Sequence, residues 1–599
     1  MGFLSPSPLP VEPEAFAALS HRERVRILTA DWVTTGFGVQ KVVHLIYILK
    51  VGLIYAVGGA LVVSLTSPGL GSLLQFGHWW SEPIVYQKLI LWTVLLEVLG
   101  CGGAWGPLCG HFKPFTGGWR YWLRPGTLRM APWPGKVPLT GGDTRTIADV
   151  LLYAAILASI VVALALPGIQ TDSLRAALPG NVAGVVRPAA IAPVILLFVL
   201  TGLRDKVIFL GARGEQYVPA LIFMATLPFV DMIIALKLLI VVVWVGAGFS
   251  KLGEHFINVI PPMVGNAPFV PKAVKRAHFR NPPNDLLPSN VSWFMAHIGG
   301  TLTEIIVPLT LLFATNKWVV LACVVYMVIF HTFIASTFPL AVPLEWNVIF
   351  GFAAVFLFVG YPARDGYWLF DFSHPGLLVL IAVALVFFPA LGNFRPDLVS
   401  FLPSMRQYAG NWASGLWALA PGAEAKFDRV TRSASNTIDQ LVAFGFERET
   451  AEEMLYRSLA WRALHSQGRG LYSVIYTHLD DPDRYTLREG EIACSTFLGW
   501  NFGDGHLHDE RLIAAIQKQA QFEPGEFVVA FVESEPYGRK RGFQEYRVID
   551  AALGVVERGT WRVHDCVKEQ PWLPNGPVPL NVTWTMPGYV RGGLRGSAA

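Results

Sequence analysis

Long apolar stretches recur along the first two-thirds of the chain and stop near residue 393. A membrane-spanning helix needs about 20 consecutive, mostly apolar residues. The pattern predicts such helices in runs at 41–66, 85–107, 146–167, 187–203, 217–252, 291–313, 318–339, 346–361 and 375–392. The fifth run is interpreted either as one tilted helix or as a short helix that ends at Pro228 and precedes a full span from Phe229 to Leu252. The sequence therefore predicts about nine or ten transmembrane helices.

Three further segments flank this transmembrane domain of residues 41–393. Residues 1–40 are interpreted as a cytoplasmic or interfacial segment, because basic and apolar residues alternate there in an amphipathic pattern. Residues 394–425 have the pattern of an amphipathic connector. From Lys426 charged residues return and long apolar runs stop, which predicts a soluble α+β domain over residues 426–599.

Local signals indicate both helices and strands in that C-terminal domain. Thr450 and Glu453 have the spacing of a capping box, which predicts a helix that continues to about His465. Phe527–Val532 is interpreted as a buried strand, and residues 546–563 as further strands with a turn at 557–559. The predicted fold class is an α-helical polytopic membrane protein with a small soluble α+β C-terminal domain.

The composition agrees with a membrane protein and excludes an ordinary soluble one. Hydrophobic residues make up 53 % of the chain and charged residues 15 %, whereas a soluble domain has about 25 % charged residues. The net charge of +4 comes with no basic run, so no nucleic-acid partner is expected. The five cysteines have no CxxC spacing, which argues against a metal cage, and Cys494 and Cys566 could pair only outside the cytoplasm.

The distribution of Lys and Arg among the loops predicts the orientation in the membrane. The loop after the second run contains six basic residues, whereas the loop 67–84 contains none. Because cytoplasmic loops are enriched in Lys and Arg, the N-terminus and loop 108–145 are expected in the cytoplasm of a multi-pass cell-membrane protein. Loop 253–290 is also basic; if it is cytoplasmic too, the fifth run is a hairpin and the C-terminal domain is cytoplasmic, which is the preferred interpretation.

The block Trp244–Phe256 is the most specific candidate for chemistry. Gly246, Ala247, Gly248 and Ser250 form a small-residue surface that another helix or a flat ligand can approach closely. Lys251 and His255 are four residues apart, which places them on one face if the helix continues. A lysine in an apolar site can lose its proton near neutral pH and act as a base. The alternative is a lysine that extends from the helix end to the membrane interface.

This block resembles the "alanine-glycine, then lysine-leucine" signature of the horizontally transferred transmembrane superfamily, which includes vitamin K-dependent gamma-carboxylase. The resemblance implies that Lys251 is a catalytic base and that a reduced quinone is its cofactor. The soluble tail does not match the carboxylase's luminal region, so the resemblance does not extend to protein carboxylation. The whole chain resembles a bacterial family of large transmembrane proteins of unknown function, through the blocks 392–397 and 499–508.

A second constellation lies on one predicted helix. His297, Thr301 and Glu304 have spacings of four and three, which would place them on a common face. An ionisable group at membrane depth usually faces a cavity or a partner. Glu304 is therefore expected to pair with Lys251 or to relay protons, with a purely structural pair as the alternative. His331 is a third candidate for ligand binding beside Gly248 and His297, and Asp231 and Lys237 are further intramembrane polar residues with packing roles as the alternative.

A third constellation lies in the C-terminal domain. His506 and His508 are flanked by aspartates and could hold a metal ion. Alternatively, Gly503–Gly505 is a tight turn and His508 or Asp509 caps a helix over Glu510–Gln519.

These candidates favour a membrane-embedded enzyme or binder of a lipid-soluble ligand, a quinone or an isoprenoid. Lys251 would be the base, and His255 or Glu304 would tune it or relay protons. The expected partners are the lipid bilayer and a lipid-soluble small molecule. A transporter and a scaffold subunit of a membrane complex are the alternatives, although no internal repeat supports the transporter. No P-loop, GxSxG, HExxH or dinucleotide-binding fingerprint is present in a suitable context.

Overall fold

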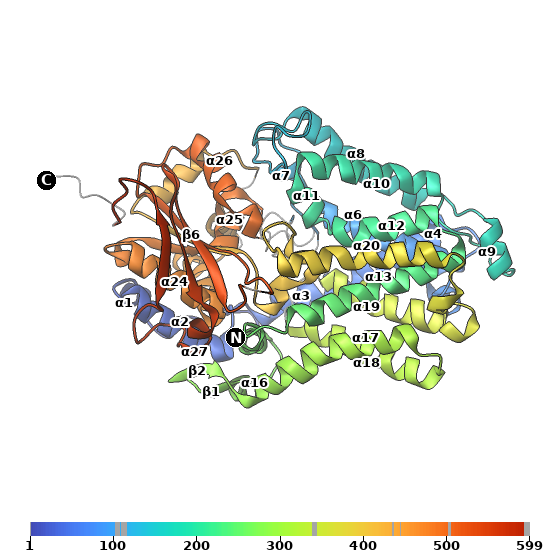
Figure 1. The fold of residues 1–599 in the computed structure, drawn as a ribbon, viewed down its shortest axis with the longest axis horizontal. Coiled ribbons are helices and arrows are strands. Elements are labelled where there is room, and N and C mark those ends of the chain that lie inside the picture. The colour runs from blue at the N-terminus through green and yellow to red at the C-terminus, as the bar shows by residue number, and fades with distance from the viewer. Residues whose placement is uncertain are drawn as a thin grey trace.

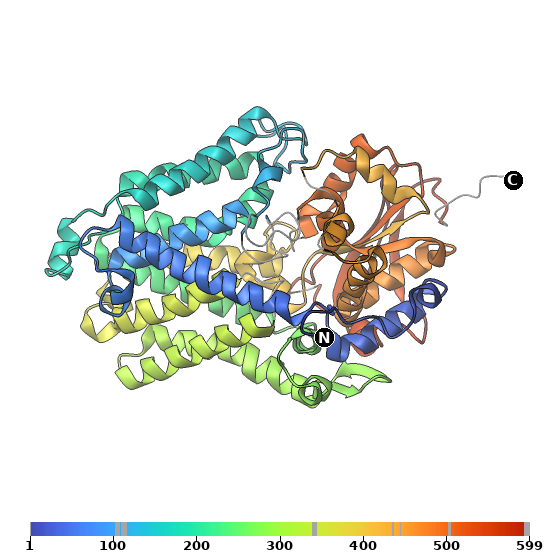
Figure 2. The ribbon, with the colours of Figure 1, turned by 180° about the vertical axis from the view of Figure 1, so that it is seen from behind.

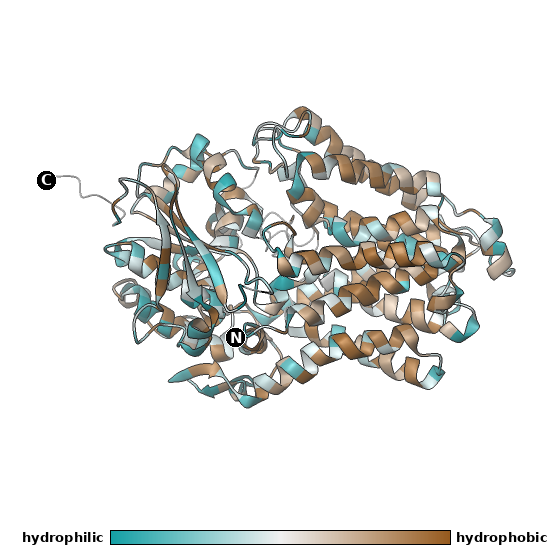
Figure 3. Ribbon diagram, in the orientation of Figure 1, coloured by the Kyte–Doolittle hydropathy of each residue, from teal (hydrophilic) through white to brown (hydrophobic). Residues whose placement is uncertain are grey.

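A bundle of long helices with an α+β domain at one end makes up the computed structural model of this chain (Figure 1). The structure describes residues 2–101, 108, 117–337, 344–433, 436–443, 445–500, 505–538 and 540–591. Figure 2 shows the same arrangement from behind. Hydrophobic residues predominate along the helices of the bundle, whereas hydrophilic residues are more frequent in the α+β domain (Figure 3).

The bundle consists of helical segments that follow the predicted apolar runs. In chain order they are α3 (Lys41–Lys50) continuing through the π-helix η1 (Val51–Val57) into α4 (Gly58–Thr66), α6 (Pro83–Leu99), α8 (Ile147–Ala165), α10 (Pro188–Arg204), α12 (Gly214–Thr226), α13 (Phe229–Ser250), α16 (Asn290–Phe294) continuing through the π-helix η4 (Met295–Leu302) into α17 (Thr303–Phe313), α18 (Lys317–Thr337), α19 (Leu344–Val355) continuing into the π-helix η5 (Phe356–Gly360), and α20 (Pro375–Phe394).

Within the described residues, six of these helices are long and apolar enough to cross a membrane, or up to seven if the bent pair at 346–371 is one span. The segments α6 and α10 have 17 residues each and α12 has 13, which is shorter than the usual span of about 20 residues. The fifth run divides at Pro228, the N-cap of α13, so the second of its two interpretations is the one found. The predicted fold class is confirmed, but six or seven helices of the described residues are long and apolar enough to span a membrane, against the nine or ten predicted.

Helix α13 lies at the centre of the bundle and α20 at its outside. In their most apolar 18-residue stretches, 78 % of α13 is buried but only 11 % of α20. Helix α13 packs against α12, α17 and α20, so its polar residues face protein and not lipid. Because an apolar exterior needs no protein cover in lipid, α20 can remain exposed along most of its length.

The connections between helices alternate between two ends of the bundle. At the end far from the α+β domain, the Tyr361 hydroxyl donates to the Ser81 carbonyl at 2.7 Å. The Phe229 amide donates to Ser173 Oγ at 3.2 Å, which ties the start of α13 to the connection after α8. These hydrogen bonds bring together connections that are far apart in the sequence.

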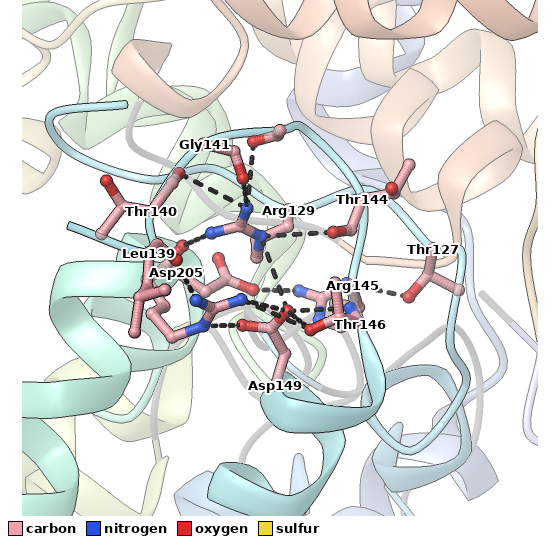
Figure 4. Close-up of polar contacts among 12 residues, drawn as sticks. Thr127, Arg129, Leu139, Thr140, Gly141, Thr144, Arg145, Thr146, Asp149 and Asp205 are labelled. Carbon is pink, nitrogen blue, oxygen red and sulfur yellow. Dashed lines mark hydrogen bonds and ion pairs between the residues drawn. The ribbon is translucent and has the colours of Figure 1, made fainter. Parts of the chain in front are cut away.

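At the other end, the intervening connections contact the α+β domain. Lys206 Nζ donates to the His506 carbonyl at 3.0 Å, and Lys518 forms an ion pair with Asp143. Arg469 Nη2 donates to Asn258 Oδ1 at 3.0 Å. The loop that carries Asp143 is itself held to α8 and α10 by a polar cluster (Figure 4), whose ion pairs join Arg129 and Arg204 to Asp149 and Arg145 to Asp205.

The N-terminal segment lies at this same end. The amphipathic helix α2 (His21–Thr35) packs on α23 (Arg448–Leu464) of the α+β domain, and Arg457 forms an ion pair with Asp31. Its apolar residues Val25, Leu28, Trp32 and Val33 are almost fully buried in protein. The amphipathic face expected at the membrane interface is therefore covered by protein, namely by α23 and by α14 (Ile260–Asn266) of the connection after α13.

The alternation places the N-terminal segment, loop 117–146 and the α+β domain on one side of the membrane. In a cysteine-free background, we expect Lys136→Cys and Arg558→Cys to resist a membrane-impermeant maleimide in intact cells, and Gln75→Cys to react. Because cytoplasmic loops are enriched in Lys and Arg, we expect the side with the basic loops to be the cytoplasmic one. If only one of Lys136→Cys and Arg558→Cys reacted, the two positions would lie on opposite sides of the membrane. If both reacted and Gln75→Cys did not, the orientation would be the reverse of the expected one.

The α+β domain is built on an antiparallel sheet with the strand order β4-β3-β5-β6-β7-β8. The strands are β3 (Ser414–Leu419), β4 (Thr486–Glu489), β5 (Phe527–Val532), β6 (Phe543–Asp550), β7 (Gly554–Arg562) and β8 (Leu580–Thr585). Every residue of β3 and β5 is buried, so both faces of the sheet are covered at these strands. Helix α24 (Ser466–His478) packs on both of them.

Several local predictions for this domain need correction. The segment 394–425, expected to be a connector, contains β3, which pairs with β4 and β5. Helix α23 ends at Leu464 as expected but begins at Arg448, where Glu447 provides no side-chain cap, so the predicted capping box is not used. The turn between β6 and β7 lies at 551–553 and not at 557–559, because the strand β7 continues through those residues.

Candidate functional site

Lys251 and Glu304 form a buried ion pair between two helices of the bundle. Lys251 is the C-cap of α13, and Glu304 lies in the first turn of α17. The two side chains are in direct contact, and the residues are 6 % and 4 % exposed. The Phe256 ring lies beneath the ammonium group, with 5.1 Å between Nζ and the ring centroid. The predicted pairing of Glu304 with Lys251 is therefore present, and a cation at a helix C-terminus is also favoured by the helix dipole.

The small residues before Lys251 bring α17 into close contact with α13. A Cβ atom at Gly248 would lie 2.7 Å from Ile305 Cγ1 and 3.1 Å from the Thr301 carbonyl oxygen. Real Cβ atoms essentially never lie within 3.0 Å of another heavy atom, so a side chain at position 248 would force Ile305 to shift away from α13. The small-residue surface was expected to accept either another helix or a flat ligand, and the structure shows a helix, α17, packed at Gly248. That contact aligns Glu304 with Lys251.

The helix that carries Glu304 changes its pitch just before that residue. The π-helix η4 covers Met295–Leu302, and such segments are frequent at functional sites. Its wider turns invalidate the spacing argument that placed His297 and Glu304 on one face. His297 is only partly buried and packs on Trp293, with 5.0 Å between the rings, whereas Thr301 and Glu304 face the protein interior.

His331 belongs to a separate hydrogen-bonded network near the same end of α13. Trp244 Nε1 donates to His331 Nε2 at 2.9 Å. Nε2 is therefore the acceptor, which leaves the proton on Nδ1, 3.0 Å from the Asn347 side-chain oxygen. All three residues are buried. This network positions α18 and α19 against α13 and holds the imidazole in one tautomer.

His255 does not share a helical face with Lys251, because α13 ends at Ser250 and the chain turns away. Instead it contacts the α+β domain. His255 Nδ1 and Ser466 Oγ share a hydrogen bond of 2.7 Å, and Nε2 lies 3.2 Å from Glu535 Oε2. Burial acts to raise the pKa of Glu535, but His255 and the Gly542 amide, which donates to Oε1 at 2.5 Å, keep it below its ordinary value.

The loop that carries Glu535 also covers the end of α13. The Tyr537 hydroxyl donates to the Phe249 carbonyl at 2.6 Å, and the Tyr537 amide donates to the Asn393 carbonyl at 2.8 Å. Glu535 and Ser466 were not predicted as site residues. They lie more than 200 residues from His255 in the sequence, and no local pattern links such positions.

Exposed apolar side chains flank both members of the ion pair in the sequence. Phe249 and Leu252, on either side of Lys251, are 47 % and 46 % exposed, and Ile306 beside Glu304 is 51 % exposed. On one side the site thus borders the lipid-facing surface of the bundle, and on the other it borders the α+β domain.

The candidate metal ligands in the α+β domain have other environments. His506 Nε2 lies 2.9 Å from Glu533 Oε2, and the His506 carbonyl accepts from Lys206. His508 is buried near Trp500, and Asp509 caps α26 (Glu510–Ala520), its carboxylate accepting from the Arg511 amide at 3.0 Å. The capping alternative is thus present. Asp504 lies outside the described residues, among which no three His, Cys, Asp or Glu side chains are grouped to hold a metal.

Comparison with known proteins gives one match. The family described as "Transmembrane protein of unknown function (DUF3556)" has a model that matches residues 1–583, nearly the whole chain. No curated protein and no solved structure matches. The family match agrees with the resemblance to bacterial transmembrane proteins of unknown function, and no match links the chain to the carboxylase superfamily.

Proposed function

Since this chain belongs to the DUF3556 family of transmembrane proteins of unknown function, we propose that it is a membrane-embedded enzyme or binder of a lipid-soluble ligand, a quinone or an isoprenoid. The observation that carries the proposal is the buried Lys251–Glu304 pair, whose neighbours in the sequence, Phe249, Leu252 and Ile306, are exposed apolar side chains. A buried ion pair is costly to maintain, because both charges lose their hydration, so its presence favours a functional role.

The surroundings of the pair provide the parts that proton exchange with such a ligand requires. A polar headgroup that enters beside Phe249 would meet the Lys251 ammonium and the Glu304 carboxylate, which can exchange a proton between them. His255 and Glu535 extend from the next turn of the chain to the α+β domain. In this role Lys251 is the base, Glu304 accepts or returns its proton, and His255 connects the site to the aqueous side.

The test is to quantify quinones and isoprenoid lipids that co-purify from native membranes with the wild type and with Lys251→Met. We expect the variant to retain at least tenfold less of the ligand, because the charged partner of its headgroup is lost. Lys237→Met is the matched control: Lys237 is also a buried lysine of α13, but its Nζ donates to the Tyr361 and Tyr367 carbonyls at 2.6 and 2.7 Å. No such lipid in the wild type, or equal loss in both variants, would refute the proposal.

Lys251→Arg distinguishes an enzyme from a binder. Arginine keeps the charge and the pair with Glu304 but cannot lose its proton usefully. If Lys251 is a base, the ligand recovered from the arginine variant should be unreacted substrate that differs from the wild-type ligand in mass or, for an isomer, in chromatographic retention and fragmentation. The same ligand by all three criteria in both proteins would indicate binding without a reaction.

A transporter is the second candidate. Helix α13 carries Asp231, Lys237 and Lys251 from its far end to its near end, and all three are buried. A line of buried polar groups through a central helix is typical of an ion or substrate path. Ion-driven uptake by reconstituted vesicles, without any co-purifying lipid, would favour this function. If neither a co-purifying lipid nor ion-driven uptake is found, the remaining candidate is a scaffold subunit whose α+β domain binds a partner.

A further inference from the structure

A group of basic residues lies where two long helices begin, beside the α+β domain. Lys272 and Arg276 of α15 (Lys272–Ala277) are exposed, as is Arg280 of the hairpin strand β1 (Phe279–Asn281). Lys275 is 3 % exposed, and Lys41 begins α3. These five residues, here called the basic patch, lie on the connection before α16 and at the start of the first long helix.

No ion pair neutralises the basic patch among the described residues. None of its five members forms an ion pair with a described carboxylate. Lys275 Nζ donates only to the carbonyls of Thr34 and Gly265, at 3.1 and 2.7 Å. Its burial, together with the charges of Lys41 and Lys272, lowers the pKa of Lys275 to about 8. Cations that repel one another in this way leave a positive potential that an anion can neutralise.

Exposed apolar side chains border the basic patch. Phe269 and Val274 are 59 % and 46 % exposed, and Trp293 and Phe294 at the start of α16 are 51 % and 61 % exposed. Ser292 Oγ donates to the His278 carbonyl at 2.8 Å, which fastens α16 to the end of α15. Exposed basic and aromatic residues therefore lie on adjoining segments, α15 with its flanks and the start of α16.

The same surface receives the N-terminus of the chain. The Gly2 and Phe3 carbonyls accept from the amides of Lys41 and Val42 at 3.2 and 3.0 Å. This pairing places Phe3, which is 58 % exposed, beside the start of the first long helix. Aromatic residues next to basic ones at helix ends are typical of the membrane–water interface.

We propose that the basic patch binds the phosphate-bearing headgroup of an anionic phospholipid in the leaflet that faces the α+β domain. The unpaired cations provide the electrostatic attraction, and Trp293, Phe294 and Phe269 fit the acyl boundary next to the headgroup. A soluble anion would use the cations but gain nothing from these rings. This inference does not depend on Lys251 or on the proposed function.

The test is native mass spectrometry of the full-length protein in mild detergent at low ionic strength, titrated with phosphatidylglycerol or phosphatidylcholine. We expect preferential binding of phosphatidylglycerol. Lys272→Gln combined with Arg276→Gln should weaken it by about 25-fold, because each basic residue near an anionic surface contributes about fivefold. Both side chains are exposed, so the double variant should fold, and its thermal unfolding temperature checks this.

The matched control is Arg484→Gln combined with Arg558→Gln, which removes two exposed charges from the α+β domain. It should bind phosphatidylglycerol as the wild type does. Equal binding of the two lipids by the wild type would overturn the proposal, as would equal loss in both double variants. Inorganic phosphate that displaces the lipid at equal concentration would also overturn it, because the patch would then be a phosphate site and not a lipid surface.

Discussion

Lys251→Met is expected to lower the free energy of unfolding by about 3 kcal/mol, because it leaves Glu304 buried without its partner. Glu304→Met should lower the free energy of unfolding by about the same amount, because it leaves the Lys251 ammonium buried without its partner. The combined variant should be more stable than either single one, since two apolar side chains of similar length replace a pair whose desolvation is expensive. Chemical unfolding of the purified protein in mixed micelles, followed by tryptophan fluorescence, measures all three.

The non-additivity is the informative quantity in this comparison. Residues in direct contact usually show interaction energies of about 0.5–3 kcal/mol, whereas independent sites add. Losses that sum in the combined variant would show that Lys251 and Glu304 do not depend on one another. A stable combined variant that has also lost its ligand would show that the pair serves function more than folding.

The second large effect concerns the boundary of the α+β domain. A fragment from Lys426 to Ala599 is expected to aggregate, because it lacks β3, the strand between β4 and β5. Leu416, Trp417 and Leu419 of β3 are fully buried, and losing three such side chains costs about 6 kcal/mol. That is comparable with the whole stability of a domain, about 5–15 kcal/mol.

A fragment that starts at Pro396 keeps β3 and is the matched comparison. It should be soluble, and residues 2–40 supplied as a separate peptide should raise its unfolding temperature, because α2 covers α23. Circular dichroism during heating measures both. A cooperatively unfolding Lys426–Ala599 fragment would show that β3 is dispensable and would restore the boundary expected from the charge pattern.

Hydropathy predicted the long helices well, because a helix that faces lipid must have an apolar surface. A helix such as Ile147–Ala165 needs only an apolar surface and internal hydrogen bonds, and both are local properties. The break at Pro228 was also foreseeable, since proline disrupts a helix interior and begins a new one. The same reasoning failed for β3, because a strand buried on both faces resembles any other short apolar run, and its neighbours β4 and β5 follow about 70 and 110 residues later.

The sequence by itself determined that this is a membrane protein with a soluble C-terminal part, and it selected Lys251 and Glu304 as candidates, because charged residues in apolar runs are rare and costly. Only the tertiary structure showed which groups they meet. It joined His255 to Glu535 across the fold, separated His297 from Glu304 through a π-helix, and covered the N-terminal amphipathic segment with α23. These contacts depend on how distant elements pack, and side-chain packing between such elements leaves no periodic signal in the chain.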